Sequence, residues 1–242
     1  MNLLSVRDLE VRHGLLRAVR GVSFDIAKGE TVALIGANGA GKTTLLRALA
    51  GAHLPLSGKI SFSQVDVTML PSHLRVRSGI SLVPEGRRLF GDLSVMDNLL
   101  LGRAVGRPGG WTPDSVMEAL PQLKPIRHSL AKNLSGGQQQ AVAIARALMA
   151  NPTLLLLDEI SLGLSPAAVD LVYATIEKLI EAGTTIILVE QNLDRAVSVA
   201  NRLVCMLEGS VVLEGNAGSL ERSRITDAYF GLNSSRVAGG HP

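Results

Sequence analysis

The sequence predicts an α/β fold built around a parallel core sheet, and three observations support this class. Short apolar runs suited to buried strands alternate with segments of helical period from residue 31 onward. One of these runs, 31–35, leads into a glycine-rich loop. Another, 154–157, ends in two acidic residues. Both features would lie at the carboxyl ends of strands, where α/β sheets bind their ligands.

The N-terminal residues predict a second, different sheet. Apolar and polar residues alternate in 3–11 and again in 21–26, with turn residues between the two segments. Such alternation is typical of antiparallel strands that have one buried face. We expect residues 59–63 to join them, which gives an N-terminal antiparallel β subdomain beside the core sheet.

The apolar run at 31–35 is followed by the pattern of a phosphate-binding P-loop. Its residues are Gly36, Ala37, Asn38, Gly39, Ala40, Gly41, Lys42, Thr43 and Thr44. Glycines allow positive φ, so the backbone N–H groups can turn inward around phosphate oxygens. The helix that follows over 45–50 presents its positive end to the same anion before Gly51 stops it.

The end of this loop indicates which ligand it holds. Lys42 would reach the β- and γ-phosphates, and the hydroxyl of Thr43 is placed to bind Mg²⁺. The loop therefore predicts a nucleoside triphosphate with its metal rather than a dinucleotide. The alternative is a glycine-rich turn that matches by chance, and the strand before it and the helix after it argue against that.

Residues 70–130 predict an inserted helical subdomain. Prolines and the glycine-rich stretch 106–110 interrupt its helical period, so we expect mobile joints between its helices. Trp111, the only tryptophan, follows that stretch, and one interpretation is an exposed loop tip. A helix over 135–150 then ends at Asn151 and Pro152.

This helix begins with Ser135, Gly136, Gly137 and Gln138. Ser135 and Gln138 have the spacing of a capping box, which would start any helix. The two glycines lower helix propensity and serve no helical purpose, but they expose N–H groups at the positive end of the helix. The motif therefore predicts a second phosphate-binding segment, and both interpretations can hold together.

Residues 154–159 are Leu-Leu-Leu-Leu-Asp-Glu, a buried strand that ends in two carboxylates. This is the Walker B pattern. Because side chains alternate along an extended chain, Asp158 can face Mg²⁺ while Glu159 points elsewhere and accepts a proton from the attacking water. The simpler alternative is a strand that leaves the core into solvent, which the P-loop makes less attractive.

The remaining pattern completes the alternation of strand and helix. We expect a helix over 167–181, a buried strand over 184–189 and an edge hairpin around residues 208–209. Cys205, the only cysteine, lies in an apolar stretch and is expected to be a small buried hydrophobe, with no disulfide inside the chain. Residues 233–242 are small and polar and predict a disordered tail.

Composition limits the possible functions. A chain of 242 residues suffices for one large α/β domain, or for a core domain with a small appended subdomain. Its net charge is only +3 and aromatic residues make up 3%, which argues against a nucleic-acid platform. No apolar run approaches the roughly 20 residues of a membrane-spanning helix, and the N-terminus lacks the pattern of a secretory signal. We therefore expect the protein to remain in the cytosol.

Together these motifs resemble the nucleotide-binding subunit of an ATP-binding cassette (ABC) transporter. The resemblance covers residues 3–232 and implies one nucleotide-binding domain over 1–232, with a helical subdomain inserted at about 70–150. The signature segment, residues 135–138, is its diagnostic part. Two such subunits meet head to tail in this family, so the signature segment of one would act on the ATP held by the P-loop of the other. The resemblance implies an ATPase that uses ATP and Mg²⁺.

Four positions depart from the usual family pattern. A glutamine is usual after the strand at 79–83 and Glu85 stands there, while Gln191 replaces the switch histidine. His13 aligns with the aromatic residue that stacks on adenine. The segment after Walker B lacks the usual proline and aspartate. Val-Pro-Glu-Gly-Arg-Arg, Ser-Leu-Gly-Leu and Val-Glu-Gln-Asn together resemble the second ATPase of branched-chain amino-acid importers, the LivF type.

The resemblance also implies roles for these residues. Glu159 would be the catalytic base, with Lys42 and Gln191 at the γ-phosphate. Because Gln191 lacks the titratable cation of a histidine, we expect slower hydrolysis at this site. Mg²⁺ would be held by Thr43, Asp158 and Glu85.

Some of these roles have plain alternatives. Glu85 would otherwise be a solvated loop residue, and His13 either stacks on adenine or lies on the surface. Arg87, Arg88 and Arg103 would bind a membrane subunit or be solvated. Trp111 would either contact that subunit or be an exposed loop tip.

The resemblance implies partners as well. These are two transmembrane permease subunits, a second ABC ATPase subunit and, indirectly, an extracytoplasmic solute-binding protein, with the chain peripheral on the cytoplasmic face of the inner membrane. A mixed pair of ATPases is favoured, and a pair of identical chains is possible.

Several other functions remain open. A urea or short-amide importer or a lipid exporter would use a similar cassette. A non-transport ABC ATPase usually carries two cassettes or a long coiled-coil insertion, and this chain has neither. A regulatory ATP-binding subunit with little hydrolysis is suggested by Gln191.

Overall fold

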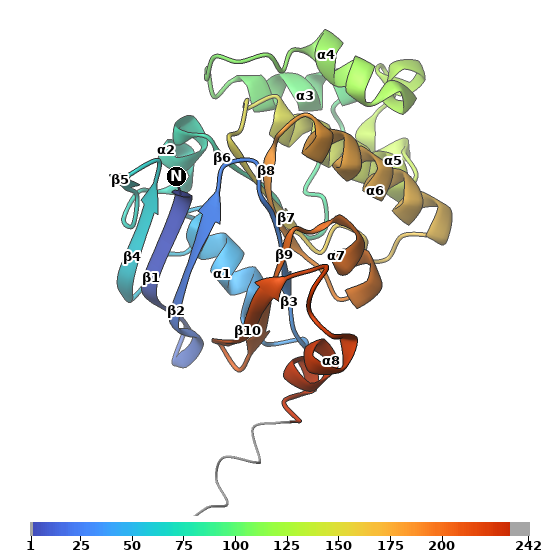
Figure 1. Cartoon of the computed structure of the whole chain (residues 1–242). Coiled ribbons are helices and arrows are strands. Elements are labelled where there is room, and N and C mark those ends of the chain that lie inside the picture. Colours follow the sequence, from blue (N-terminus) through green and yellow to red (C-terminus); the bar gives the residue numbers. More distant parts are fainter. Residues whose placement is uncertain (1, 233–242) are drawn as a thin grey trace, which may run out of the picture. The chain divides into compact units, whose positions relative to one another are not determined.

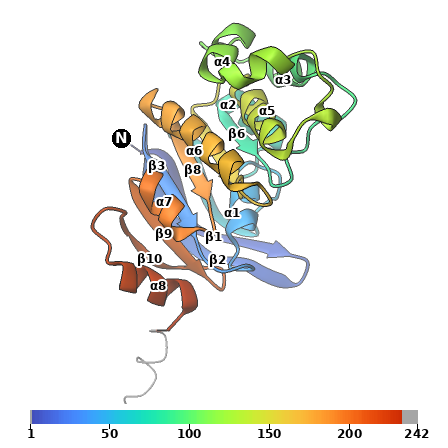
Figure 2. The same ribbon diagram turned by 90° about the vertical axis from the view of Figure 1, so that its right-hand side faces the viewer.

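The computed structural model describes residues 2–232, so the predicted tail at 233–242 lies outside the described residues. The described chain falls into two compact units. The first comprises 2–49, 53–69 and 188–232, and the second comprises 50–52 and 70–187. Figures 1 and 2 show the chain from two directions.

The first unit contains the predicted antiparallel sheet. Its strands are β1 (Asn2–His13), β2 (Leu16–Ala27), β4 (Ser57–Phe62) and β5 (Val65–Asp66), in the order β2-β1-β4-β5 (Figure 1). All neighbouring strands pair antiparallel. Leu4, Val6 and Leu9 are fully buried, as the alternating pattern predicted. The antiparallel β subdomain is therefore confirmed.

Parallel pairing in the first unit joins β3 (Thr31–Ile35) to β9 (Arg202–Leu207). Every residue of β3 is buried, which is typical of a strand covered on both faces. β9 then pairs antiparallel with β10 (Ser210–Asn216). Glu208 and Gly209 connect them with φ values of 47° and 85°, the conformation of a tight hairpin, and confirm the hairpin predicted there.

Three helices belong to the first unit: α1 (Lys42–Leu49), α7 (Leu193–Val199) and α8 (Arg222–Phe230). α7 and α8 contribute Ala196 and Ile225 to a core that includes Ile35 and Cys205. Burial raises the pKa of the Cys205 thiol to about 11, so the thiol is neutral near pH 7 and behaves as the predicted hydrophobe.

The second unit combines parallel strands with most of the helices. β6 (Ile80–Val83) and β7 (Leu154–Asp158) pair parallel, and β8 (Thr185–Val189) begins in this unit. The helices are α2 (Ser72–Ser78), α3 (Val95–Arg103), α4 (Pro113–Ala119), α5 (Gly136–Leu148) and α6 (Pro166–Glu181), with short 3-10 turns η1 (Pro121–Ile126) and η2 (Ala131–Asn133). α5 packs against both α3 and α6 (Figure 2). Within residues 2–232, no helix is both long and apolar enough to cross a membrane.

The prolines of the second unit begin helices more often than they interrupt them. Pro113 and Pro166 occupy the first turns of α4 and α6, where the missing N–H has no partner to lose. Ser94, Thr112 and Ser135 cap α3, α4 and α5, each with a complete capping box. Local sequence therefore defines these helix starts.

One predicted mobile joint, the glycine-rich loop at 106–111, is tied to the rest of the second unit. Asn151 Oδ1 accepts a hydrogen bond from Trp111 N at 2.7 Å, and Asn151 Nδ2 donates to Arg107 O at 3.2 Å. The Arg107 guanidinium donates to Asn151 O and, at 2.8 Å, to Thr153 Oγ1. Trp111 is half-buried and not an exposed loop tip, because a residue 40 positions away holds its backbone.

Candidate nucleotide-binding site

The P-loop connects β3 to α1 in the first unit. Gly36, Gly39 and Gly41 have φ values of 146°, 83° and 99°. A Cβ on Gly36 would lie 2.2 Å from Met206 O, and a Cβ on Gly41 would lie 2.2 Å from Ala18 O. These two positions therefore require glycine both for their dihedral angles and because a neighbouring main chain comes too close for a side chain.

Lys42 is the first residue of α1 and is only 4% exposed. Its Nζ donates to Gly36 O at 2.7 Å and to Ala37 O at 2.9 Å, so the ammonium lies inside the curve of the loop. Ala40 O accepts from Gly209 N at 3.0 Å, which fixes the loop to the β9–β10 hairpin. An ammonium enclosed by a glycine-rich turn at a helix N-terminus fits a polyphosphate.

The other loop residues are distributed around this ammonium. Asn38 and Gly39 are exposed at the tip of the loop, while Thr43 and Thr44 are half-buried in the first turn of α1. A Cβ on Gly39 would meet no atom within 4 Å, so only its positive φ favours glycine there. The loop has the shape that the sequence predicted.

The predicted switch residue, Gln191, lies in the first unit at the end of β8. Its N–H donates to Glu190 Oε2 at 3.2 Å, and Glu190 N donates to Leu34 O at 3.3 Å on β3. Glu190 is only 2% exposed, and sequence reasoning missed this buried carboxylate. The adjoining Asn192 caps α7 by accepting from Arg195 N at 3.1 Å. Gln191 therefore lies between a buried strand end and a helix cap.

His13 is exposed at the end of β1. Its ring lies edge-to-face against His53, with centroids 5.8 Å apart and an interplanar angle of 71°. His53 Nε2 lies 2.6 Å from Arg12 O, which holds the second ring in place. The exposed His13 ring stays compatible with either of its predicted roles, adenine stacking or a surface position.

The Walker B carboxylates belong to the second unit. Asp158 is the last residue of β7 and is only 1% exposed. Glu159 follows with φ of 46°, a left-handed conformation that non-glycine residues rarely adopt, and is half-buried. The chain therefore leaves the strand direction between the two acids. Backbone outliers of this kind cluster at functional sites.

The predicted magnesium ligands are divided between the units, with Thr43 in the first and Asp158 and Glu85 in the second. Glu85 is exposed in the loop after β6. Within residues 2–232, no group of three or more His, Cys, Asp or Glu side chains forms a metal site by itself. Magnesium commonly binds one or two carboxylates together with substrate phosphates, so the chemistry of this donor set fits the ion.

The signature segment begins α5 and forms the predicted capping box. Gln138 N donates to Ser135 Oγ at 3.3 Å, and Ser135 N donates to Gln138 Oε1 at 3.0 Å. The expectation that the glycines serve no helical purpose is incomplete. A Cβ on Gly137 would lie 2.8 Å from the Ala168 Cβ, so this glycine lets α5 pack against α6.

The three arginines with an open role differ in their surroundings. Arg87 is half-buried, and its Nη1 donates to Gln139 Oε1 on α5 at 3.2 Å. Arg88 and Arg103 are exposed. Arg87 is therefore neither simply solvated nor directed only at a partner, and the sequence carried no signal for this contact between residues 52 positions apart.

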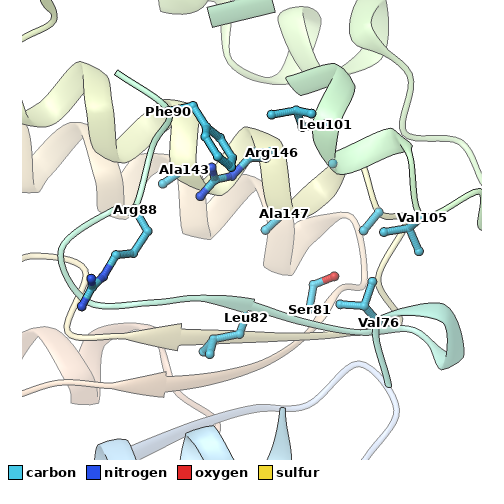
Figure 3. A pocket seen from close by; sticks show the side chains of 12 residues that line it. Val76, Ser81, Leu82, Arg88, Phe90, Leu101, Val105, Ala143, Arg146 and Ala147 are labelled. Carbon is cyan, nitrogen blue, oxygen red and sulfur yellow. The ribbon is translucent and has the colours of Figure 1, made fainter. Parts of the chain in front are cut away.

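A cavity of about 530 Å³ lies within the second unit, among β6, α3 and α5 (Figure 3). Its lining includes Leu82, Arg88, Phe90, Leu101, Ala143 and Arg146. The Arg146 guanidinium lies 5.8 Å from the centroid of the Phe90 ring, and burial lowers the pKa of Arg146. Ser81 Oγ, directed toward the cavity in Figure 3, is buried and has no hydrogen-bond partner within residues 2–232.

Comparisons with known proteins agree with this geometry. The ABC transporter family model matches residues 19–161. The high-affinity branched-chain amino acid transport ATP-binding protein BraG of Pseudomonas aeruginosa is 41% identical over 95% of this chain and 100% of BraG. The lipopolysaccharide export system ATP-binding protein LptB of Escherichia coli is 31% identical over 96% of this chain and 98% of LptB.

Solved structures give the same result. A crystal structure of an ATP-binding cassette of an ABC transporter, in its ADP conformation, matches with a TM-score of 0.83. It is 26% identical to this chain, and the match covers 96% of this chain and 99% of that one.

Proposed function

The chain belongs to the ABC transporter family, and we propose that it is the ATP-binding and ATP-hydrolysing subunit that energises a membrane importer of branched-chain amino acids. The observation that carries the substrate class is the 41% identity to BraG over the full length of that transport protein. The loop sequence Val-Pro-Glu-Gly-Arg-Arg and the replacement of the switch histidine by Gln191 support the same subtype.

ATP binds first at the P-loop of the first unit. Backbone N–H groups between Gly36 and Thr44 surround the phosphates, and Lys42 exchanges its carbonyl partners for the β- and γ-phosphate oxygens. The exposed ring of His13 contacts adenine. The neutral amide of Gln191 donates a hydrogen bond to the γ-phosphate without adding charge.

Hydrolysis is in-line attack of water on the γ-phosphorus. Glu159 accepts the proton from the attacking water while the bond to the β–γ bridging oxygen breaks, and ADP and phosphate leave. Thr43, Asp158 and Glu85 would hold Mg²⁺, which would neutralise charge on the phosphate oxygens. The protein contributes mainly position and electrostatic stabilisation, as in other phosphoryl transfers.

A pair of cassettes forms the working unit. The signature segment of one subunit contacts the ATP on the P-loop of its partner, so that ATP binding closes the pair and hydrolysis opens it. A mixed pair with a second ABC ATPase is favoured over two copies of this chain. The pair lies peripherally on the cytoplasmic face of the membrane, against two permease subunits.

The cavity of the second unit is the site where a segment of the permease would bind. Its apolar side chains, among them Phe90 and Leu101, would pack against apolar groups of the permease. Arg88, Arg146 and the hydroxyl of Ser81 would bind an acidic or hydrogen-bonding side chain. Leu101→Arg, at a position 43% exposed, should prevent assembly with the permease and leave ATP binding intact. Assembly retained by this variant would place the contact elsewhere.

The experiment that tests this function uses the chain reconstituted with its co-encoded membrane subunits in vesicles. ATP hydrolysis is measured with solute-binding protein that is empty or loaded with leucine, isoleucine or valine. Stimulation by the loaded protein is expected, and the Glu159→Gln complex is the inactive control. Hydrolysis without stimulation would overturn amino-acid import, and absence of hydrolysis would overturn the ATPase role.

The second candidate is the ATPase of a lipid exporter, which the 31% identity to LptB favours. The same vesicles distinguish it, because an exporter would be stimulated by a lipid substrate in the membrane and not by a loaded solute-binding protein.

A further inference from the structure

We propose that Arg87 is a positioning residue for the signature segment, which it fixes to the loop 84–90 that carries Glu85. This inference rests on the proposed function, because the signature segment acts only when two cassettes enclose ATP. It goes further by giving a task to an arginine outside the P-loop, Walker B and signature motifs.

The side chain of Arg87 lies against the first turn of α5. Its Nη1 donates to Gln139 Oε1 at 3.2 Å, and its Nη2 would be 3.3 Å from a Cβ on Gly136. Gln139 Nε2 donates in turn to Ala131 O at 3.1 Å. Gln139 is thus oriented at both ends of its amide, so its oxygen is fixed toward Arg87.

The backbone of Arg87 is held by the same helix. Arg146 Nη2 donates to Arg87 O at 3.2 Å, and Arg146 lies two turns beyond Gln139 on α5. The Arg146 guanidinium also lies over the ring of Phe90, near the end of the loop. α5 therefore binds both the main chain and the side chain of Arg87, at two separate points along its length.

Two features of this arrangement oppose folding stability. Arg87 and Arg88 both have left-handed backbones, with φ of 63° and 49°, which strains residues other than glycine. A cation beside the N-terminus of α5 also opposes the helix dipole. Because both features cost stability, we interpret the Arg87 contact as one that positions the signature segment and not as one that stabilises the fold. Strained residues are often found at functional sites.

Further contacts join residues 91–93, which directly follow the loop, to the segment just before α5. Lys132 N donates to Gly91 O and Ala131 N donates to Leu93 O, each at 3.0 Å. Lys132 Nζ forms an ion pair with Asp92 at 2.7 Å. Arg87 extends this series of contacts to α5 itself. A displacement of the loop that carries Glu85 is therefore transmitted to the signature segment of the same chain.

The test uses the assembled transporter and three variants. Arg87→Gly removes the side chain and relieves the strained φ, Arg87→Lys keeps the charge, and Gln139→Ala removes the acceptor. We expect Arg87→Gly to lower kcat about tenfold, as loss of a hydrogen bond to a charged group predicts. The Kd of the isolated chain for ATP should stay unchanged and its thermal midpoint should not fall, and Arg87→Lys should restore part of kcat.

Gln139→Ala should lower kcat by the same factor, and the double variant should lower it no further, because both remove one contact. Arg77→Ala, an exposed arginine on α2 of the same unit, controls for loss of charge. A wild-type kcat for Arg87→Gly, additive losses in the double variant, or an equal loss in Arg77→Ala would each overturn the inference. If the unmutated transporter hydrolyses no ATP, the proposed function itself fails.

Discussion

The P-loop and the signature segment are both rich in glycine and both open a helix, yet they need glycine for different reasons. In the P-loop, Gly36 and Gly41 have positive φ, and main-chain oxygens lie 2.2 Å from where their Cβ atoms would be. Gly136 and Gly137 belong to the regular helix α5, and the nearest atoms to their Cβ positions are side-chain atoms. No second mutation can remove a main-chain oxygen that crowds a glycine. A crowding side chain, in contrast, can be replaced by a smaller one.

The two regions also differ in what holds them. Carbonyl groups of the P-loop accept hydrogen bonds from the Lys42 ammonium and from Gly209 of the β9–β10 hairpin. The signature segment is held by its own capping box, and Arg87 binds the side chain of Gln139, the next residue of α5. The first region is fixed mainly by main-chain contacts and the second by side chains, so the second is more open to adjustment.

The largest expected effect separates ATP binding from ATP hydrolysis. Glu159→Gln keeps the shape of the side chain but removes the proton acceptor, so hydrolysis should fall about 10²- to 10⁴-fold while ATP still binds. Steady-state hydrolysis and calorimetric titration with ATP measure the two quantities. Lys42→Ala is the contrasting variant and should lose ATP binding as well. Substantial hydrolysis in Glu159→Gln would exclude Glu159 as the base.

The next effect concerns the P-loop glycines. Gly41→Ala should destabilise the chain by about 1–3 kcal/mol and abolish ATP binding, because it combines a strained φ with a contact to Ala18 O. Gly39→Ala is the matched control, since it has a positive φ but no atom within 4 Å of its Cβ position. Denaturant unfolding compares them. Equal losses in both variants would show that φ alone matters.

A smaller, reversible effect is expected in the signature segment. Gly137→Ala would place its Cβ 2.8 Å from the Ala168 Cβ, and overpacking of this kind typically costs about 1–3 kcal/mol. Because the contact is to a side chain, Gly137→Ala combined with Ala168→Gly should recover most of the lost stability, as measured by thermal unfolding. No recovery in the double variant would contradict the distinction between the two glycine-rich regions.

The smallest expected effect on stability concerns a surface ion pair of the first unit. Arg7 Nη2 donates a hydrogen bond to Asp25 Oδ2 at 2.7 Å. This hydrogen bond lowers the pKa of Asp25 below its ordinary value of 3.8. Ionised Asp25 therefore adds stability above pH 3.8, and this is lost as the pH falls through the lowered pKa. Arg7→Gln should lower Tm by about 1 °C at pH 7.

The difference in Tm between Arg7→Gln and the unmutated chain should shrink as the pH falls through the lowered pKa of Asp25, because below that pKa Asp25 is protonated in both. Thermal unfolding at neutral and acid pH checks this. A difference that persists at low pH would mean that Arg7 stabilises the sheet by a contact other than its ion pair.

Much of the fold follows from local sequence. The alternating pattern at 3–11 predicted β1, and the apolar runs predicted β3 and β7. The P-loop and the capping box at Ser135 were predicted residue by residue, since both depend on neighbours within a few positions. The boundary between the units at about residue 70 coincides with the predicted change to helical period, whereas the boundary at about residue 188 had no such local signal.

Other features depend on residues far apart in the chain. Asn151, with φ of 50°, ties down the loop at 106–111, where the sequence suggested a mobile joint. Glu190 is a buried carboxylate next to Gln191, although its neighbours in sequence do not mark it as unusual. Arg87 contacts Gln139, where the resemblance implied a cation that binds a membrane subunit or is solvated.

The sequence by itself determined the kinds of strand and helix, the helix caps and the dihedral needs of the P-loop. These depend on side-chain period and short-range hydrogen bonds, which adjacent residues encode. Only the tertiary structure decided which main chain crowds Gly36, which helix crowds Gly137 and what Arg87 binds. Such contacts join distant residues, and they become defined only when the whole chain packs, because close packing is a property of the assembled core.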